Sequence, residues 1–159
     1  MKPMLKGALA ALAISVALPA AALAAGFDVN VTTTDLALRG YDPVSYFTDG
    51  APTPGEIDIT AEHQGAIYRF ASAEHKAMFE ADPAKYAPQY GGYCAFGLAQ
   101  GYKFDGDPQV WKIVDDKLYL NLSPKVSTIW QQDVPGNIEN ADAKWQMVKD
   151  ADPSDLAPK

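Results

Sequence analysis

The stretch IDITAEHQGAIYRFASAEHKAMFEA, residues 57–81, decides the fold of the chain around it. Apolar and polar residues alternate over 57–61 and again over 66–70, which is typical of half-buried β-strands. Gln64-Gly65 lies between the two runs and is suited to a tight turn, because glycine accepts backbone angles that other residues resist. Residues 57–70 are therefore predicted to form a β-hairpin.

A helix is predicted directly after this hairpin. Ser72 is a favourable N-cap residue, and Glu74 would lie in the positively polarised first turn of a helix over about 73–81. Asp82-Pro83 ends it, because the residue before a proline avoids helical angles. The stretch as a whole predicts a compact β-β-α unit.

The flanking sequence adds shorter elements to this unit. Residues 27–31 alternate and predict a strand or an extended lead-in, and Asp42-Pro43 predicts a short helix over 44–47. Residues 97–108 are polar and rich in glycine and predict a loop. A second hairpin is expected over 110–121 and is followed by two helices, over about 124–132 and through Val148. The fold class is therefore α+β, a β-β-α unit extended by a second hairpin and C-terminal helices.

The first residues predict an export signal. Two lysines precede an almost wholly apolar run over 8–18, and Ala22-Leu23-Ala24 offers the small residues that a signal peptidase requires. The run is short for a membrane span, so we expect cleavage near Ala24, a periplasmic or secreted protein and no stable membrane insertion. The expected organisation is a signal peptide over 1–24, one domain over 25–150 without internal repeats, and a frayed tail over 151–159.

The charge of the chain excludes some partners. The formal net charge is −7, and loss of the two lysines with the signal peptide makes it about −9. Such a chain repels phosphate groups, so neither nucleic acid nor an anionic membrane surface is an expected partner.

The single cysteine, Cys94, lies in the stretch QYGGYCAFG, residues 89–97. One cysteine cannot form an internal disulfide, so it is a buried inert thiol, an intermolecular bridge, a reactive thiol or a metal ligand. A position at a helix start would lower the pKa of the thiol, whereas burial between Tyr93 and Phe96 would raise it. The sequence leaves these alternatives open.

Three motifs in order resemble the YHS domain family, especially its exported bacterial members. They are Tyr41-Asp42-Pro43-Val44, the run from Tyr68 to Phe79, and Asp82-Pro83-Ala84-Lys85-Tyr86. The resemblance implies a treble-clef-like unit related to small metal-binding modules. At the three positions that are cysteines in metal-transporter members of the family, this chain has Ser45, Ala71 and His75.

The leading hypothesis from the resemblance is a binding module for a transition metal, copper first and zinc next. Its predicted ligands are Cys94, His75 and an oxygen of Asp42, a mixed sulfur, nitrogen and oxygen set suited to such ions. His63, beside the first turn, is expected to be solvated.

Two other hypotheses remain open beside it. The first is a small-molecule or partner-binding protein without metal, with a pocket lined by Tyr41, Tyr90 and Tyr93 next to Gly91 and Gly92. The second is a redox protein that uses the thiol of Cys94, although no second cysteine is present to resolve a mixed disulfide. Whether the chain is an enzyme is left undecided, with a binding role favoured.

Overall fold

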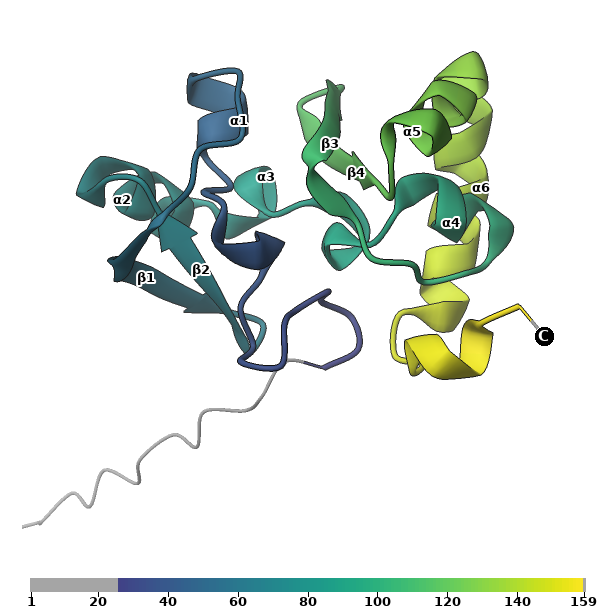
Figure 1. Cartoon of the computed structure of the whole chain (residues 1–159), viewed down its shortest axis with the longest axis horizontal. Helices are drawn as coiled ribbons and strands as arrows, with labels where there is room; N and C mark the ends of the chain where they lie inside the picture. Colours follow the sequence, from purple (N-terminus) through teal and green to yellow (C-terminus); the bar gives the residue numbers. More distant parts are fainter. Residues whose placement is uncertain (1–25, 159) are drawn as a thin grey trace, which may run out of the picture.

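The computed structural model describes residues 26–158 as an α+β protein with two antiparallel sheets of two strands each. Figure 1 shows the two sheets side by side, each with helices around it. The predicted signal peptide and its cleavage near Ala24 lie outside the described residues.

The first half of the chain is built around hairpin β1–β2. Its elements in chain order are η1 (Leu38–Gly40), α1 (Ser45–Thr48), β1 (Glu56–His63), β2 (Ala66–Phe70), α2 (Ala73–Ala81) and α3 (Pro83–Tyr86). The hairpin and the helix after it agree with the pattern of residues 57–81.

The second half is built around hairpin β3–β4. Its elements are η2 (Gln89–Gly92), α4 (Ala95–Gln100), β3 (Asp107–Val114), β4 (Lys117–Asn121), α5 (Pro124–Trp130), η3 (Gln131–Asp133), α6 (Val134–Val148) and η4 (Pro153–Leu156).

Three segments differ in part from their prediction. Residues 27–31, predicted as a strand or an extended lead-in, contribute only an isolated bridge at Val31. The first part of the expected loop over 97–108 is helical, because Cys94 caps α4. The expected frayed tail contains η4, whose first turn is capped by the carboxylate of Asp152.

No repeat is visible in the sequence, but the two halves of the structure contain a similar unit. Both hairpins pair an eight-residue strand with a five-residue strand, and both have a register irregularity near the start of the first strand. The second unit follows about fifty residues after the first, within the range of known structural repeats.

Several hydrogen bonds of the first unit have a counterpart in the second. The N–H of Asp42 donates to the Thr53 carbonyl oxygen at 2.8 Å, and the N–H of Cys94 donates to the Phe104 carbonyl oxygen at 2.8 Å. Helices α2 and α5 each begin at a serine, Ser72 or Ser123, whose hydroxyl accepts from the third residue of the helix.

The backbone angles correspond as well. Residues 38–40 and residues 90–92 each have three consecutive positive φ angles, which end at Gly40 (φ 85°) and Gly92 (φ 88°). The next helices begin after Asp82 (φ −151°) and Asp133 (φ −149°), whose side chains both cap them. We call the two units the first and the second repeat.

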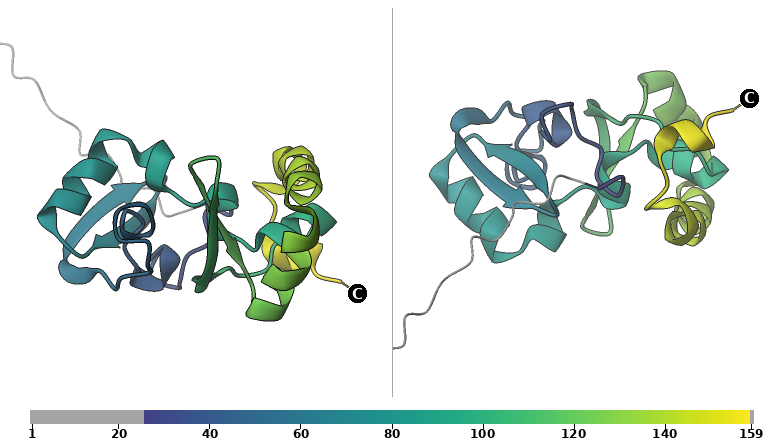
Figure 2. Two further views of the ribbon diagram at one scale, coloured as in Figure 1. Left: turned by 90° about the horizontal axis from the view of Figure 1, so that it is seen from above. Right: turned by 90° about the horizontal axis from the view of Figure 1, so that it is seen from below.

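The repeats pack in tandem, so that hairpin β3–β4 lies between the first repeat and the C-terminal helices (Figures 1 and 2). From α1 of the first repeat, the hydroxyl of Tyr46 donates to the Pro108 carbonyl oxygen at 2.8 Å, and its ring meets Trp111 edge-on. On the second repeat, α6 packs along α4 and buries Leu98 and Ala141 completely. Helix α6 thus covers the end of the tandem.

The other end of the tandem carries polar residues. Pro108 on β3 is buried under the first repeat, but the corresponding Ile57 on β1 is 69% exposed. Its neighbours Glu56, Asp58 and Glu62 are exposed as well. No further unit covers this face within residues 26–158.

Glycine at position 91 is a requirement of this fold. Gly91 has φ 60°, and a Cβ there would collide with the carbonyl oxygen of Asp28, because residues 28–30 cross directly over it. We predict that Gly91→Ala lowers the free energy of unfolding by about 3 kcal/mol or more, because backbone would have to move.

The matched control is Gly50→Ala. Gly50 also has a positive φ, 65°, but no atom lies within 4 Å of an added Cβ, so only the left-handed backbone penalty of about 1 kcal/mol is expected. Urea denaturation of both variants checks the prediction, and equal losses would contradict it.

Candidate functional site

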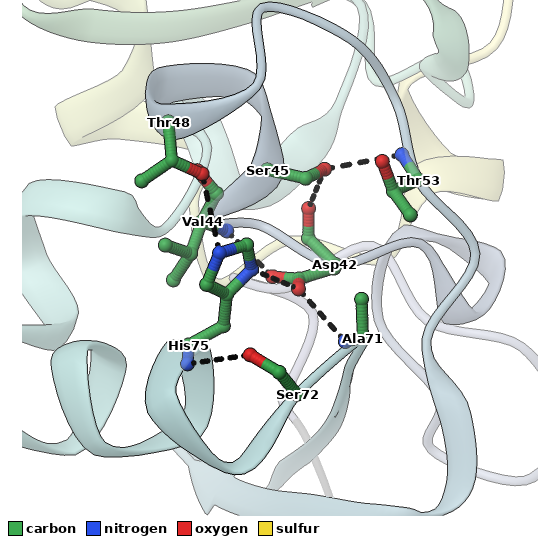
Figure 3. Close-up of polar contacts among 8 residues, drawn as sticks. All are labelled: Asp42, Val44, Ser45, Thr48, Thr53, Ala71, Ser72 and His75. Carbon is green, nitrogen blue, oxygen red and sulfur yellow. Dashed lines mark hydrogen bonds and ion pairs between the residues drawn. The ribbon is translucent and has the colours of Figure 1, made fainter.

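Asp42 is a buried carboxylate at the start of the first repeat. None of its surface is exposed, and it follows Tyr41 where the chain enters α1. Its Oδ1 accepts from the Val44 N–H at 2.8 Å, and its Oδ2 accepts from the Ala71 N–H at 2.8 Å (Figure 3). The carboxylate therefore joins the start of α1 to the end of β2.

His75 supplies the third hydrogen bond to this carboxylate. Its Nδ1 lies 2.6 Å from Asp42 Oδ2, and its Nε2 lies 3.3 Å from the Thr48 hydroxyl oxygen (Figure 3). An ionised carboxylate can only accept, so the Nδ1–H of His75 donates to Asp42. With 15% of the side chain exposed, Nε2 is the atom of this group that can meet a ligand.

Cys94 lies in the second repeat and has different partners. Its sulfur accepts from the N–H groups of Gly97 at 3.4 Å and Leu122 at 3.2 Å, and lies 3.6 Å from Asn121 Oδ1. The residue is 1% exposed, and burial raises the pKa of the thiol although these N–H donors oppose the shift. A buried thiol that stays protonated fits a structural role and not that of a reactive nucleophile.

Cys94 corresponds by position to Asp42, because both side chains accept the same kind of backbone hydrogen bond. Asp42 accepts from Ala71 and Cys94 from Leu122, the residues that directly follow β2 and β4. The residue that corresponds to His75 is Val126, the third residue of α5. One repeat thus forms the cap without an imidazole, so His75 is an addition that the fold does not require.

The predicted metal ligands do not come together. Asp42 and His75 are in contact, but Cys94 shares no hydrogen-bond partner with them, and Figure 1 shows α2 and α4 in opposite halves of the molecule. Within residues 26–158 no group of three or more His, Cys, Asp or Glu side chains is arranged to hold an ion. Both oxygens of Asp42 already accept hydrogen bonds. The residues therefore do not fit a closed metal site.

The three predicted pocket tyrosines also separate. The Tyr41 hydroxyl accepts from Gln109 Nε2 at 2.8 Å, whereas the Tyr90 hydroxyl donates to Asp142 at 2.8 Å. Tyr93 lies against Trp145 and beneath the Lys103 ammonium group, and burial raises its pKa to about 12. Gly91 and Gly92 carry positive φ angles that allow the backbone to turn.

A cleft between the two repeats was missed from the sequence, although Tyr90 and Gly91 line it. Its volume is about 410 Å³, in the range of small-molecule sites. The walls come from the lead-in, the first hairpin turn, the connection after α3 and the end of α6, which no local pattern brings together. Its chemically distinctive side chains are Asp28, His63, Tyr68, Trp145 and Lys149.

The Tyr68 hydroxyl is unusual among these groups. The residue is 1% exposed, yet its hydroxyl makes no hydrogen bond to any of residues 26–158, whereas Tyr46 and Tyr90 both donate one. Burial and the carboxylate of Asp28 both raise its pKa, so the hydroxyl keeps its proton at neutral pH. It is an unused donor in the wall of the cleft.

No protein-family model, curated protein or solved structure matches the chain. The resemblance to the YHS family therefore stays a prediction. None of the helices in residues 26–158 combines the length and the apolar character that crossing a membrane requires.

The correspondence between the repeats predicts what happens when residues of the first repeat are replaced by their counterparts from the second. Asp42→Ala should lower the free energy of unfolding by about 2–4 kcal/mol, because it leaves two buried N–H groups and an imidazole without their acceptor. The double variant Asp42→Cys, His75→Val copies the pair found at Cys94 and Val126. We expect it to fold cooperatively and to recover at least half of that loss.

Thermal and urea unfolding followed by circular dichroism measure both variants. If the double variant is as unstable as Asp42→Ala, the imidazole is part of the structural cap after all.

Proposed function

We propose that the protein is an exported YHS-like module that binds a small organic molecule in the cleft between its two repeats. The observation that carries this proposal is the cleft itself, a concave space of about 410 Å³ whose wall includes the Tyr68 hydroxyl. This hydroxyl makes no hydrogen bond to residues 26–158, so it is free to donate to an acceptor on a ligand.

The other walls of the cleft are suited to such a ligand. Trp145 provides an aromatic surface, and Ala84, Ala87 and Pro88 form an apolar wall. Burial lowers the pKa of His63, so its imidazole is neutral at pH 7 and offers either a donor or an acceptor. A few polar groups in a partly apolar concave site are the usual composition of a small-molecule site.

A substitution that fills the cleft with a larger side chain tests the proposal. Ala84 is exposed at the cleft wall, so Ala84→Trp should fill the space without disturbing the core. A library of small organic molecules is screened against the mature protein by thermal shift and tryptophan fluorescence. We expect hits whose affinity falls at least tenfold in Ala84→Trp and in Tyr68→Phe.

The control is Ala81→Trp, at the exposed end of α2 and away from the cleft. It should bind every hit as the unmodified protein does. Tyr68→Phe should keep full stability, because the hydroxyl has no partner to lose. Hits that bind Ala84→Trp undiminished, or no hits at all, would contradict the proposal.

A second candidate function is weak contact with a transition metal ion, copper first, at Nε2 of His75. The observation that favours it is the carboxylate behind Nδ1, since metal-binding histidines commonly donate their other N–H to such a group. Here Asp42 orients the imidazole and is not a ligand, and Cys94 has no part. The remaining ligands would come from solvent or from a partner.

Titration with Cu(II) and Zn(II), followed by the His75 resonances in NMR, tests this candidate. We expect at most one weakly bound ion, with binding lost in His75→Ala and unchanged in Cys94→Ala and His63→Ala. Loss of binding in Cys94→Ala would instead support the ligand set predicted from the sequence.

A further inference from the structure

We infer that the ligand of the cleft is a small zwitterion that carries an ammonium group, a carboxylate and an apolar or aromatic side chain. This inference rests on the proposed function and adds the chemical class of the ligand. It comes from two charges of opposite sign, Asp28 and Lys149, that line the same cleft.

The two charges are available to a ligand. Both residues are partly exposed, and neither forms an ion pair with any charged side chain in residues 26–158. They also lie further apart than an ion pair, so a ligand that ends in two opposite charges could reach both. Such charge complementarity contributes more to the specificity of a site than to its affinity.

Their positions are fixed by one buried lysine. Lys103 is 4% exposed, and its ammonium group donates to the carbonyl oxygens of Phe27, Lys149 and Ala151. It thereby holds the backbone beside Asp28 and the backbone of Lys149 itself. Burial lowers the pKa of Lys103, and the negative charge of Asp28 opposes that shift.

The rest of the cleft suits the remainder of such a molecule. The Tyr68 hydroxyl lines the same cleft as Asp28 and Lys149 and can donate to the ligand carboxylate. Trp145 can pack against an apolar or aromatic side chain. The imidazole of His63, at the end of β1 and in the lining of the cleft, adds a neutral polar contact.

The net charge of the chain argues against a ligand of one sign. With a net charge of about −9 in its mature form, the protein repels simple anions over most of its surface, so Lys149 alone offers them little. A simple cation would be attracted to many acidic residues and would gain little from this cleft in particular. A zwitterion avoids both problems, because it uses both charged groups of the cleft at once.

Three probes of similar size test the inference. They are phenylalanine, phenethylamine and 3-phenylpropionate, which share the ring and carry both charges, the ammonium alone or the carboxylate alone. Isothermal titration of the mature protein should show phenylalanine binding at least tenfold more tightly than either of the others.

Two variants assign the charges. Asp28→Asn should weaken phenylalanine and phenethylamine but not 3-phenylpropionate, and Lys149→Met should weaken phenylalanine and 3-phenylpropionate but not phenethylamine. Neither side chain makes a hydrogen bond or ion pair within residues 26–158, so Lys149→Met should unfold at the same temperature as the parent. Asp28→Asn removes a charge that favours the buried ammonium group of Lys103 and should unfold at a slightly lower temperature. Lys144→Met, on the same helix but outside the cleft lining, is the control and should change nothing.

The outcomes separate the two proposals. If a singly charged probe binds as tightly as phenylalanine, or if none of the three binds, the inference of a zwitterionic ligand is overturned. The library screen against Ala84→Trp then still decides the proposed function. If phenylalanine binds equally well to Ala84→Trp, it lies elsewhere and the inference is overturned as well.

Discussion

The structure depends on a buried acceptor side chain that is used once in each repeat. The chain enters each repeat through three residues with positive φ. Two positions later, the side chain of Asp42 or Cys94 accepts a hydrogen bond from the first N–H after the second strand of the hairpin. In the first repeat this acceptor is a carboxylate and in the second a thiol. Because the contact joins segments far apart in sequence, it fixes how the lead-in turn, the short helix and the hairpin lie relative to one another. Either chemistry satisfies the buried N–H groups, which would otherwise be left without a partner.

The sequence predicts a helix or strand well where local signals, such as a cap residue or a proline, mark both of its ends. The helix over 73–81 has a serine cap and a proline stop, and its predicted bounds agree with α2. Helix α4 could not be predicted in the same way, because its cap is a cysteine and its first residues include glycine. Cysteine is a weak acceptor and is not among the usual N-cap residues, so no usual cap marks the start of this helix.

The repeat was hidden for a related reason. The two copies keep the residues that the backbone requires, such as Gly40 and Gly92 or Ser72 and Ser123, but few of the side chains between them. Core positions differ because the first repeat packs on a hairpin and the second on a long helix. The Asp42–His75 contact was predicted in part, since both residues were named as ligands of one site. The cleft could not be predicted, because its walls come from four separate segments whose relative positions depend on the tandem packing.

The hydrogen bonds of Lys103 couple two segments that lie at opposite ends of the sequence. Its single ammonium group donates to the carbonyl oxygens of Phe27, Lys149 and Ala151, so the lead-in and the segment after α6 are held against each other. A change that displaces either segment would therefore also displace the other, and with it two walls of the cleft.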